Sequence, residues 1–445
     1  MSRYTSATDR DRAEMLEAIG AASVEELFED IPEGVRLKRE LDLPPGMPEN
    51  EVFDHLAALA AKNTHSDAEV TFLGAGMYDH YVPALIDSII SRSEFLTPYT
   101  PYQPEISQGG LQVMFEFQTA ISELTGLPVS NASVYEGPSA AAAAAYLART
   151  QTKRTKLVCS RGVHPHTRET LVTHSRGFGT EVVETALDEH GATDIDALAA
   201  AIDDDTAAVF LQQPNFLGTV EDIGTLAEAA KQTGALLVVS ADPLPLAILK
   251  PPGELGADIC VGEGQTLGNR LDFGGPSFGF FAASEKYIRR MPGRIAGETT
   301  DLDGKRGFVL TLQTREQHIR REKATHNICT SQALNALAGV IYLSWLGKRG
   351  AVELGELMLK RTAYAREALG LEAINPGPVV REFAVRVPDI DGFVKRAREQ
   401  GINPGYRLGR DYPEYEDGLL VAITERRTKE QIDALASLVR EAVTA

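Results

Sequence analysis

The chain has 445 residues, of which 43% are hydrophobic and 24% charged, a composition typical of a globular protein with more than one domain. Its 63 acidic and 44 basic residues give a formal net charge of −19, which argues against nucleic acid as a partner because phosphates would be repelled. No apolar run reaches about 18 residues, so no membrane span is expected. The N-terminus has no apolar signal-like stretch and the three cysteines are widely spaced, which favours a cytoplasmic protein with free thiols.

The first part of the chain, residues 1–65, predicts an N-terminal helical arm. Ser23 and Glu26 have the spacing of a capping box ahead of a helix. Proline-rich residues 43–48 predict a loop, and apolar side chains at helical spacing predict a helix over residues 50–61.

Residues 66–330 alternate short apolar strands with helices, which predicts an α/β domain whose mostly parallel sheet is covered on both faces. Strands are expected at 156–160, 181–184, 207–211, 235–240, 259–260 and 278–282. Helices are expected at 81–92, 112–124, 194–202 and 222–233, with another beginning in the alanine run 140–145.

The pattern changes after residue 330, and residues 331–445 predict a small C-terminal α/β domain. Its expected helices are 331–346, 354–369, 392–400 and 429–443, and its expected strands are 382–387 and 418–424. A large parallel-sheet domain followed by a small α/β domain is the layout of many pyridoxal-phosphate (PLP) enzymes. Such an enzyme needs helix N-terminal amides for the phosphate, a carboxylate for the pyridinium nitrogen and a Schiff-base lysine.

Two stretches offer the first two requirements. Residues 131–139 place a glycine turn ahead of a small-residue helix that ends the motif at Ser139, although Pro138 removes one amide donor. Asp242 directly follows strand 235–240, and the carboxyl ends of parallel strands are where open α/β sheets bind ligands. A close-packed helix start without a ligand, and a turn aspartate before Pro243, explain the same residues equally well.

The third requirement is missing. The lysine belongs in the turn after strand 259–260, where the glycine-rich stretch 256–276 begins, yet no lysine occurs between Lys250 and Lys286. Gln265 stands in that turn, and an amide nitrogen is not nucleophilic. We therefore expect at most a vestigial pocket around Ser139, Asp242 and Gln265, with no cofactor held by this chain.

Several motifs give the chain a family resemblance. They are Thr-Pro-Tyr-Thr-Pro-Tyr-Gln-Pro-Glu-Ile-Ser-Gln-Gly at 97–109, Asn-Ala-Ser at 131–133, Gly-Gly-Pro at 274–276 and Arg-Glu-Lys-Ala-Thr-His-Asn-Ile-Cys-Thr-Ser at 321–331. With them the chain resembles the P-protein of the glycine cleavage system, glycine dehydrogenase (decarboxylating), in the subunit 1 (alpha) type of its two-subunit form. The resemblance covers nearly the whole chain and implies the PLP-dependent transferase fold, fold type I.

The resemblance also implies a division of labour. Counting back eleven residues from Pro276 places Gln265 at the position of the catalytic subunit's Schiff-base lysine, and Asp242 matches the pyridinium-binding aspartate. PLP is then expected on a partner, the catalytic subunit 2, within a heterotetramer. Together the two subunits would decarboxylate glycine, release CO2 and transfer the aminomethyl group to the lipoyl group of H-protein, whereas this chain alone would be inactive.

The segment 97–109 is rich in proline, tyrosine and glutamine and poor in core residues. We expect it to reach the partner's active site with Tyr99, Tyr102, Gln103 and Ser107, although a loop that only builds the interface explains the composition too.

Other readings stay open. The chain could be a purely structural or regulatory partner, or an independent PLP-dependent decarboxylase or transaminase. No metal site is expected, because His164 and His166, expected on a surface loop, lack further ligands at matching spacing. The basic cluster Arg315, Arg320, Arg321 and Lys323 could dock the acidic H-protein or form a solvated helix face.

Overall fold

The structure, a computed structural model, describes residues 6–324 and 326–444. The chain falls into two compact units, Met1–Thr64 and His65–Ala445. The predicted division into 1–65, 66–330 and 331–445 stays a prediction.

The first unit contains α1 (Asp9–Ile19), two 3-10 helices (Val24–Phe28 and Glu33–Val35) and α2 (Glu49–Ala60). A complete capping box precedes α1, where Thr8 Oγ1 accepts from the Asp11 amide at 3.2 Å and the Asp11 carboxylate accepts from the Thr8 amide at 2.7 Å. The box predicted at Ser23 is only half formed and starts a 3-10 turn, because the Glu26 carboxylate accepts from the Ala22 amide instead.

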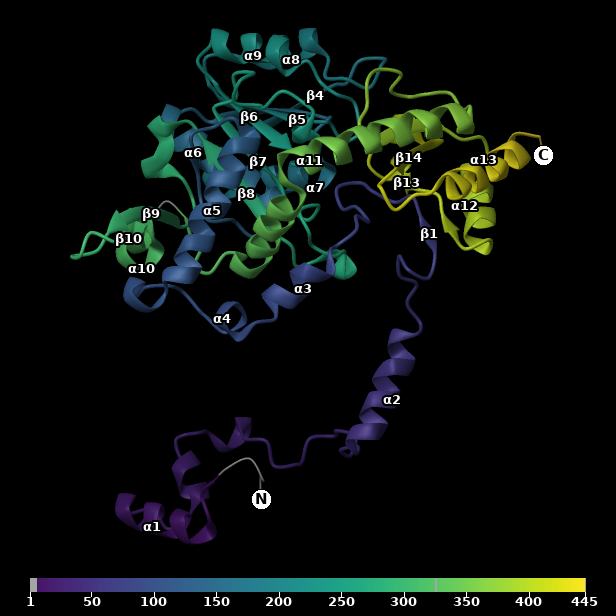
Figure 1. The fold of residues 1–445 in the computed structure, drawn as a ribbon. Coiled ribbons are helices and arrows are strands. Elements are labelled where there is room, and N and C mark those ends of the chain that lie inside the picture. The colour runs from purple at the N-terminus through teal and green to yellow at the C-terminus, as the bar shows by residue number, and fades with distance from the viewer. Residues whose placement is uncertain (1–5, 325, 445) are drawn as a thin grey trace. The chain divides into compact units, whose positions relative to one another are not determined.

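The second unit is built on a seven-stranded sheet of order β2-β8-β7-β6-β5-β3-β4 (Figure 1). Neighbouring strands from β4 through β7 pair in parallel, whereas β8 runs antiparallel to both β7 and β2. The strands are β2 (Val129–Ser130), β3 (Lys156–Ser160), β4 (Glu181–Thr185), β5 (Thr206–Gln213), β6 (Leu236–Ala241), β7 (Ile259–Glu263) and β8 (Gly279–Ala283). The predicted mostly parallel sheet is therefore confirmed.

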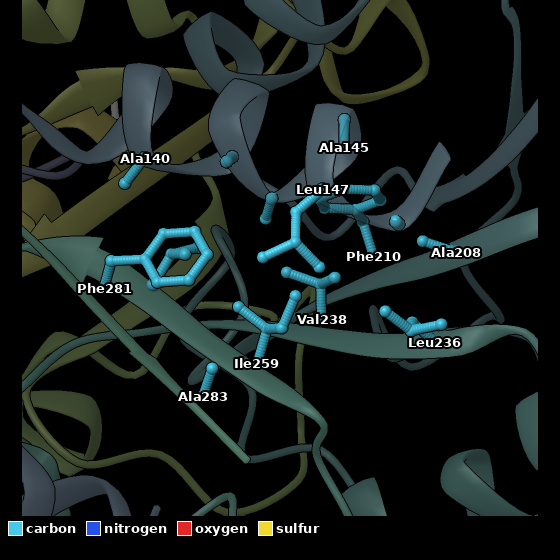
Figure 2. Packing of buried hydrophobic residues seen from close by; sticks show 14 of the residues in the cluster. Ala140, Ala145, Leu147, Ala208, Phe210, Leu236, Val238, Ile259, Phe281 and Ala283 are labelled. Carbon is cyan, nitrogen blue, oxygen red and sulfur yellow. The ribbon is translucent and has the colours of Figure 1, made fainter. Parts of the chain in front are cut away.

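Helices cover both faces of this sheet. The helices of this part of the chain are α3 (Ala84–Ile90), α4 (Ser93–Leu96), α5 (Gln108–Thr125), α6 (Gly137–Thr152), α7 (Pro165–Phe178), α8 (Ile195–Ala201) and α9 (Ile223–Gln232). Alternation along the strands decides which face each side chain serves. Phe210 and Val238 pack with Leu147 of α6 (Figure 2), whereas their strand neighbours Val209 and Leu237 pack with α8 and α9. Burial on both faces explains the continuous apolar runs of the strands.

The C-terminal part holds a three-stranded antiparallel sheet of order β11-β14-β13. Its strands are β11 (Glu382–Arg386), β13 (Tyr406–Arg407) and β14 (Gly418–Ala422); β12 (Ile402–Asn403) pairs in parallel with β1 (Val70–Thr71) instead. The helices are α10 (Gln317–Arg320), α11 (Ala333–Leu369), α12 (Ile390–Glu399) and α13 (Lys429–Thr444). The two helices predicted at 331–346 and 354–369 correspond to the two halves of α11, which are separated by a kink at Gly347, whose φ of 62° suits glycine.

A hairpin of β9 (Ile295–Thr300) and β10 (Arg306–Thr311) was not predicted. Its outer ends are polar and exposed, so the alternation that marks a strand is short. Phe308 and Leu310 of β10 pack against Leu111 and Met114 of α5. Figure 1 shows the hairpin beside this helix.

Candidate functional site

A cavity of about 600 Å³ lies at the carboxyl ends of β5, β6 and β7, the edge where open α/β sheets bind ligands. Its polar lining comes from distant parts of the chain, namely Tyr78, Glu136, His164, Gln212, Ser240, Asp242, Glu263, Thr266, Arg381 and Glu382. Asp242 was predicted at this edge, and the structure places it there.

The N-terminus of α6 borders the cavity, but its amides are already bonded to carboxylates. The Gly137 amide donates to Glu263 Oε2 at 2.9 Å, and the Ser139 amide donates to both carboxylate oxygens of Glu136 at 3.1 Å. Pro138 has no amide to donate. An anion at this helix end would displace or face two carboxylates, so the helix N-terminus does not form a phosphate site.

The carboxylate of Asp242 is likewise already paired within the chain. A guanidinium nitrogen of Arg381 is ion-paired with its carboxylate, and Arg381 Cζ lies 3.3 Å from the centroid of the Tyr78 ring. Asp242 and the neighbouring Tyr78 and Glu382 hold the pKa of Arg381 above its usual range despite burial. The side chain of Arg381 is 2% exposed, so the pair is a buried one.

Gln265 is 1% exposed, and its side chain forms hydrogen bonds with the backbone of Tyr78 and of Asn269. Its Oε1 accepts from the Tyr78 amide at 2.9 Å, and its Nε2 donates to the carbonyls of Tyr78 at 3.1 Å and Asn269 at 2.9 Å. Gln265 is adjacent in sequence to Thr266, which lines the cavity. The amide thus fixes the backbone near the cavity and uses both its polar atoms in doing so.

Tyr99, Tyr102 and Gln103 are exposed on the segment ahead of α5, and Ser107 occupies the N-cap position of that helix. The cavity is lined by other described residues, so the structure does not bring these four to Asp242 and Gln265. Tyr102 is held in place: Arg294 Nη2 donates to its hydroxyl at 3.2 Å, and Arg294 Cζ lies 4.9 Å from its ring centroid.

Two further residues that line the cavity, Glu382 and His164, were not predicted there from the sequence. Glu382 accepts from the Tyr78 hydroxyl at 2.6 Å and the Ala75 amide at 2.8 Å, and burial raises the pKa of Glu382 to about 7. His164 caps α7, its Nε2 lies 3.0 Å from the Ala75 carbonyl oxygen, and burial lowers the pKa of this imidazole to about 4. The surface loop predicted around His164 is therefore wrong, because Pro165 begins a helix.

Only part of the predicted basic cluster is exposed. Arg315 is buried and donates to the carbonyls of Met291 and Gly293, so it cannot dock a partner, whereas Arg320, Arg321 and Lys323 are exposed. In residues 6–324 and 326–444, no three His, Cys, Asp or Glu side chains are grouped to hold a metal ion. Nor does any helix of these residues have the length and apolar character needed to cross a membrane.

Comparison with known proteins places this geometry in a family. The family model described as "Glycine cleavage system P-protein" matches residues 2–439. A relative from Carboxydothermus hydrogenoformans, named probable glycine dehydrogenase (decarboxylating) subunit 1, is 52% identical over 439 residues, which cover 98% of this chain and 99% of the relative. The chain belongs to the glycine cleavage system P-protein family.

Solved structures agree with that assignment. A glycine decarboxylase (P-protein) of the glycine cleavage system, crystallised in an inhibitor-bound form, matches with a TM-score of 0.90 and 42% identity over 99% of this chain and 100% of that one. Lactobacillus brevis glutamate decarboxylase matches with a TM-score of 0.70 at 12% identity over 92% of this chain and 95% of its own. The predicted PLP-dependent transferase fold is thereby confirmed, and the chain is a P-protein subunit of glycine dehydrogenase (decarboxylating).

P-proteins use PLP, but the residues around this cavity do not fit that group. Position 265 carries an amide with all its polar atoms bonded within the chain. The amides that would cradle a phosphate donate to Glu136 and Glu263, and the carboxylate suited to a pyridinium is paired with Arg381.

The buried carboxyl of Glu263 predicts a pH dependence of stability in this P-protein subunit. Burial raises its pKa from 4.5 to about 7, so the folded state holds a proton that the unfolded state releases at lower pH. Its contribution is therefore complete below about pH 4.5 and is lost as the pH rises through 7. Glu263→Gln is expected to gain about 1–3 kcal/mol relative to the parent between pH 5 and pH 8, measured by urea unfolding at both pH values. An equal loss of stability in parent and variant would contradict this prediction.

Proposed function

We propose that this chain is the subunit of glycine dehydrogenase (decarboxylating) that carries no PLP. With a catalytic partner subunit that holds the cofactor, it decarboxylates glycine, releases CO2 and transfers the aminomethyl group to the lipoyl group of H-protein. The name "subunit 1" of the relatives implies that their P-protein has a second subunit. We propose that the assembly is a heterotetramer in the cytoplasm.

The observation that supports this proposal most directly is the bonding at the start of α6. Glu136 and Glu263 accept from the amides that a phosphate would need, and Gln265 offers no amine. The absence of a lysine at position 265 removes only the Schiff-base amine. Carboxylates at the phosphate position oppose a phosphorylated cofactor independently of that lysine. Two separate features thus argue that the cofactor resides elsewhere.

The segment before α5 supports a contribution to the partner. Leu96, Tyr99 and Ile106 are 57%, 78% and 77% exposed, an unusual exposure for large apolar side chains placed so close together. Gln108 anchors the segment, since its Nε2 donates to the carbonyls of Pro104 at 2.7 Å and Phe308 at 2.8 Å. An exposed, anchored segment suits an interface, and we propose that Tyr99, Tyr102, Gln103 and Ser107 complete the partner's active site from it.

Borohydride reduction in the presence of PLP tests where the cofactor resides. The full-length chain alone is expected to give no reducible absorbance band. When it is mixed with its catalytic partner, peptide mapping is expected to find the reduced cofactor on a partner lysine. Glycine-dependent CO2 release should need both subunits. A reduced cofactor on a lysine of this chain would overturn the proposal.

A lysine introduced at position 265 separates the effect of the missing amine from the effect of the carboxylates at the phosphate position. Gln265→Lys alone is expected to remain unlabelled, because Glu136 and Glu263 still occupy the phosphate position. The same lysine combined with Glu136→Gln and Glu263→Gln is expected to gain labelling, with circular dichroism confirming that both variants fold. Equal labelling of the two variants would show that the carboxylates do not exclude the cofactor.

A further inference from the structure

Among the charged side chains that line the cavity, acidic ones prevail. Glu136, Asp242, Glu263 and Glu382 line it, against the single guanidinium of Arg381. Asp242 is the carboxylate that Arg381 pairs with. The remaining acidic groups are the three glutamates, and burial raises the pKa of Glu263 and of Glu382 to about 7. Above that pH these groups are ionised, so the cavity favours a cation and disfavours an anion.

These glutamates keep acceptor capacity for a ligand. Glu263 accepts from Ser277 Oγ, from the Gly137 amide and from the backbone of Gln265. Glu136 accepts only from the Ser139 amide among the described residues. An ionised carboxylate offers about four acceptor positions. An ammonium group, with three donors and a positive charge, matches the positions that remain.

An independent feature of the lining is the presence of two buried polar atoms without hydrogen-bond partners. Thr266 is 3% exposed and lines the cavity, yet its Oγ1 has no hydrogen-bond partner within residues 6–324 and 326–444. Arg381 Nε, also at the cavity, lacks a partner within the same residues. Buried polar atoms are rarely left unpaired, and here two of them belong to residues that line a cavity of about 600 Å³.

We propose that this cavity is a binding site for a small organic ammonium compound, recognised by Glu136 and Glu263 and by the hydroxyl of Thr266. The ammonium donates to the two carboxylates, and the threonine hydroxyl gains a partner. Apolar side chains of the lining, among them Leu73 and Met77, contact the carbon chain of the ligand. The site therefore binds a different class of ligand from the phosphorylated cofactor that the fold holds elsewhere in the family.

Calorimetric titration with a matched set of probes tests the ligand class. The full-length chain is titrated at pH 8 with n-butylamine, n-butanol, butyrate and inorganic phosphate. Butylamine is expected to bind saturably, butanol at least tenfold more weakly, and butyrate and phosphate not at all. Equal binding of butanol and butylamine would show that the cavity only takes up an apolar chain, and binding of phosphate or butyrate in preference would reverse its charge selectivity. Either result, or no binding of butylamine, overturns the proposal.

Substitutions then locate the site. Glu136→Gln and Glu263→Gln should each weaken butylamine binding about tenfold or more, because a carboxylate is replaced by a neutral amide of the same shape. Glu353→Gln, on a glutamate whose side chain is 61% exposed on α11, is the matched control and should bind as the parent does. Unchanged affinity in both cavity variants would overturn the proposal.

Thr266→Val distinguishes a binding hydroxyl from a structural one. Removing an unpaired buried hydroxyl without changing its shape relieves a desolvation cost, so the melting temperature of the free chain should rise. Butylamine affinity should fall in the same variant. A hydroxyl with only a structural role would not give this opposite pair of changes, and unchanged affinity would exclude Thr266 from the site.

Discussion

Arg381→Met is expected to lower the free energy of unfolding by about 3–5 kcal/mol, because it leaves a buried carboxylate without its counter-charge. Arg381 is 2% exposed and Asp242 is 18% exposed at the side chain. The methionine also loses the contact of the guanidinium with the Tyr78 ring. Urea unfolding at pH 7, followed by circular dichroism, measures the difference between variant and parent.

Two controls separate the charge from the lost packing. Adding Asp242→Leu to Arg381→Met is expected to restore most of the stability, since a buried pair replaced by apolar residues is often neutral. Arg386→Met, which breaks a pair with Asp417 whose side chains are 35% and 48% exposed, should cost only about 0–1 kcal/mol. Equal losses in the Arg381 and Arg386 variants would contradict the assignment of a special role to burial.

The sheet could be predicted because its signal is local. Strand β3 was predicted at the bounds the structure has, and β5 and β6 within about two residues, since burial on both faces makes each a continuous apolar run. The two helices predicted at 331–346 and 354–369 are the two halves of α11. The positive φ of Gly347 ends the first half one residue after the predicted end.

The candidate site divides in the same way. Asp242 and Gln265 were found because each follows a strand by a short turn. Arg381 and Glu382 reach the same cavity from β11, more than a hundred residues away in sequence, and no local pattern connects them to Asp242. Glu263, by contrast, had a local signal in the sequence. It is a carboxylate at the end of β7, beside the expected phosphate position, where a negative charge opposes an anion.

The arm and the segment before α5 show a different limit. Helix α2 was predicted from its periodicity, yet neither α1 nor α2 has a buried residue. Apolar side chains such as Phe53 and Leu56 are 72% and 57% exposed on α2. Apolar periodicity predicts that such side chains pack against another apolar surface. It does not predict whether that surface belongs to the same chain or to a partner.

Tyr102→Phe is expected to lower the turnover of the assembled two-subunit enzyme about tenfold to a hundredfold without changing assembly. Within the described residues, the Tyr102 hydroxyl makes one hydrogen bond, as acceptor from Arg294 at 3.2 Å. Its own proton is therefore available to donate outward, and a hydrogen bond to a charged group contributes about 1.5–3 kcal/mol. Phenylalanine keeps the ring over Arg294 Cζ, which lies 4.9 Å from the ring centroid, so the segment should keep its shape. Initial rates of glycine-dependent CO2 release, with light scattering of the complex, measure the two quantities.

Measuring kcat and subunit assembly separately distinguishes the two roles that Tyr102 could have. If its hydroxyl contacts the reacting groups, kcat falls while subunit assembly and the melting temperature of the complex stay as in the parent. A loop that only builds the interface would instead show weaker assembly at unchanged kcat. Tyr364→Phe is the matched control, because its hydroxyl donates to Asp433 between α11 and α13 at 2.5 Å, away from this segment, and its loss should leave kcat unchanged. Unchanged turnover in the Tyr102 variant would remove this residue from the partner's active site and leave the exposed segment with an interface role alone.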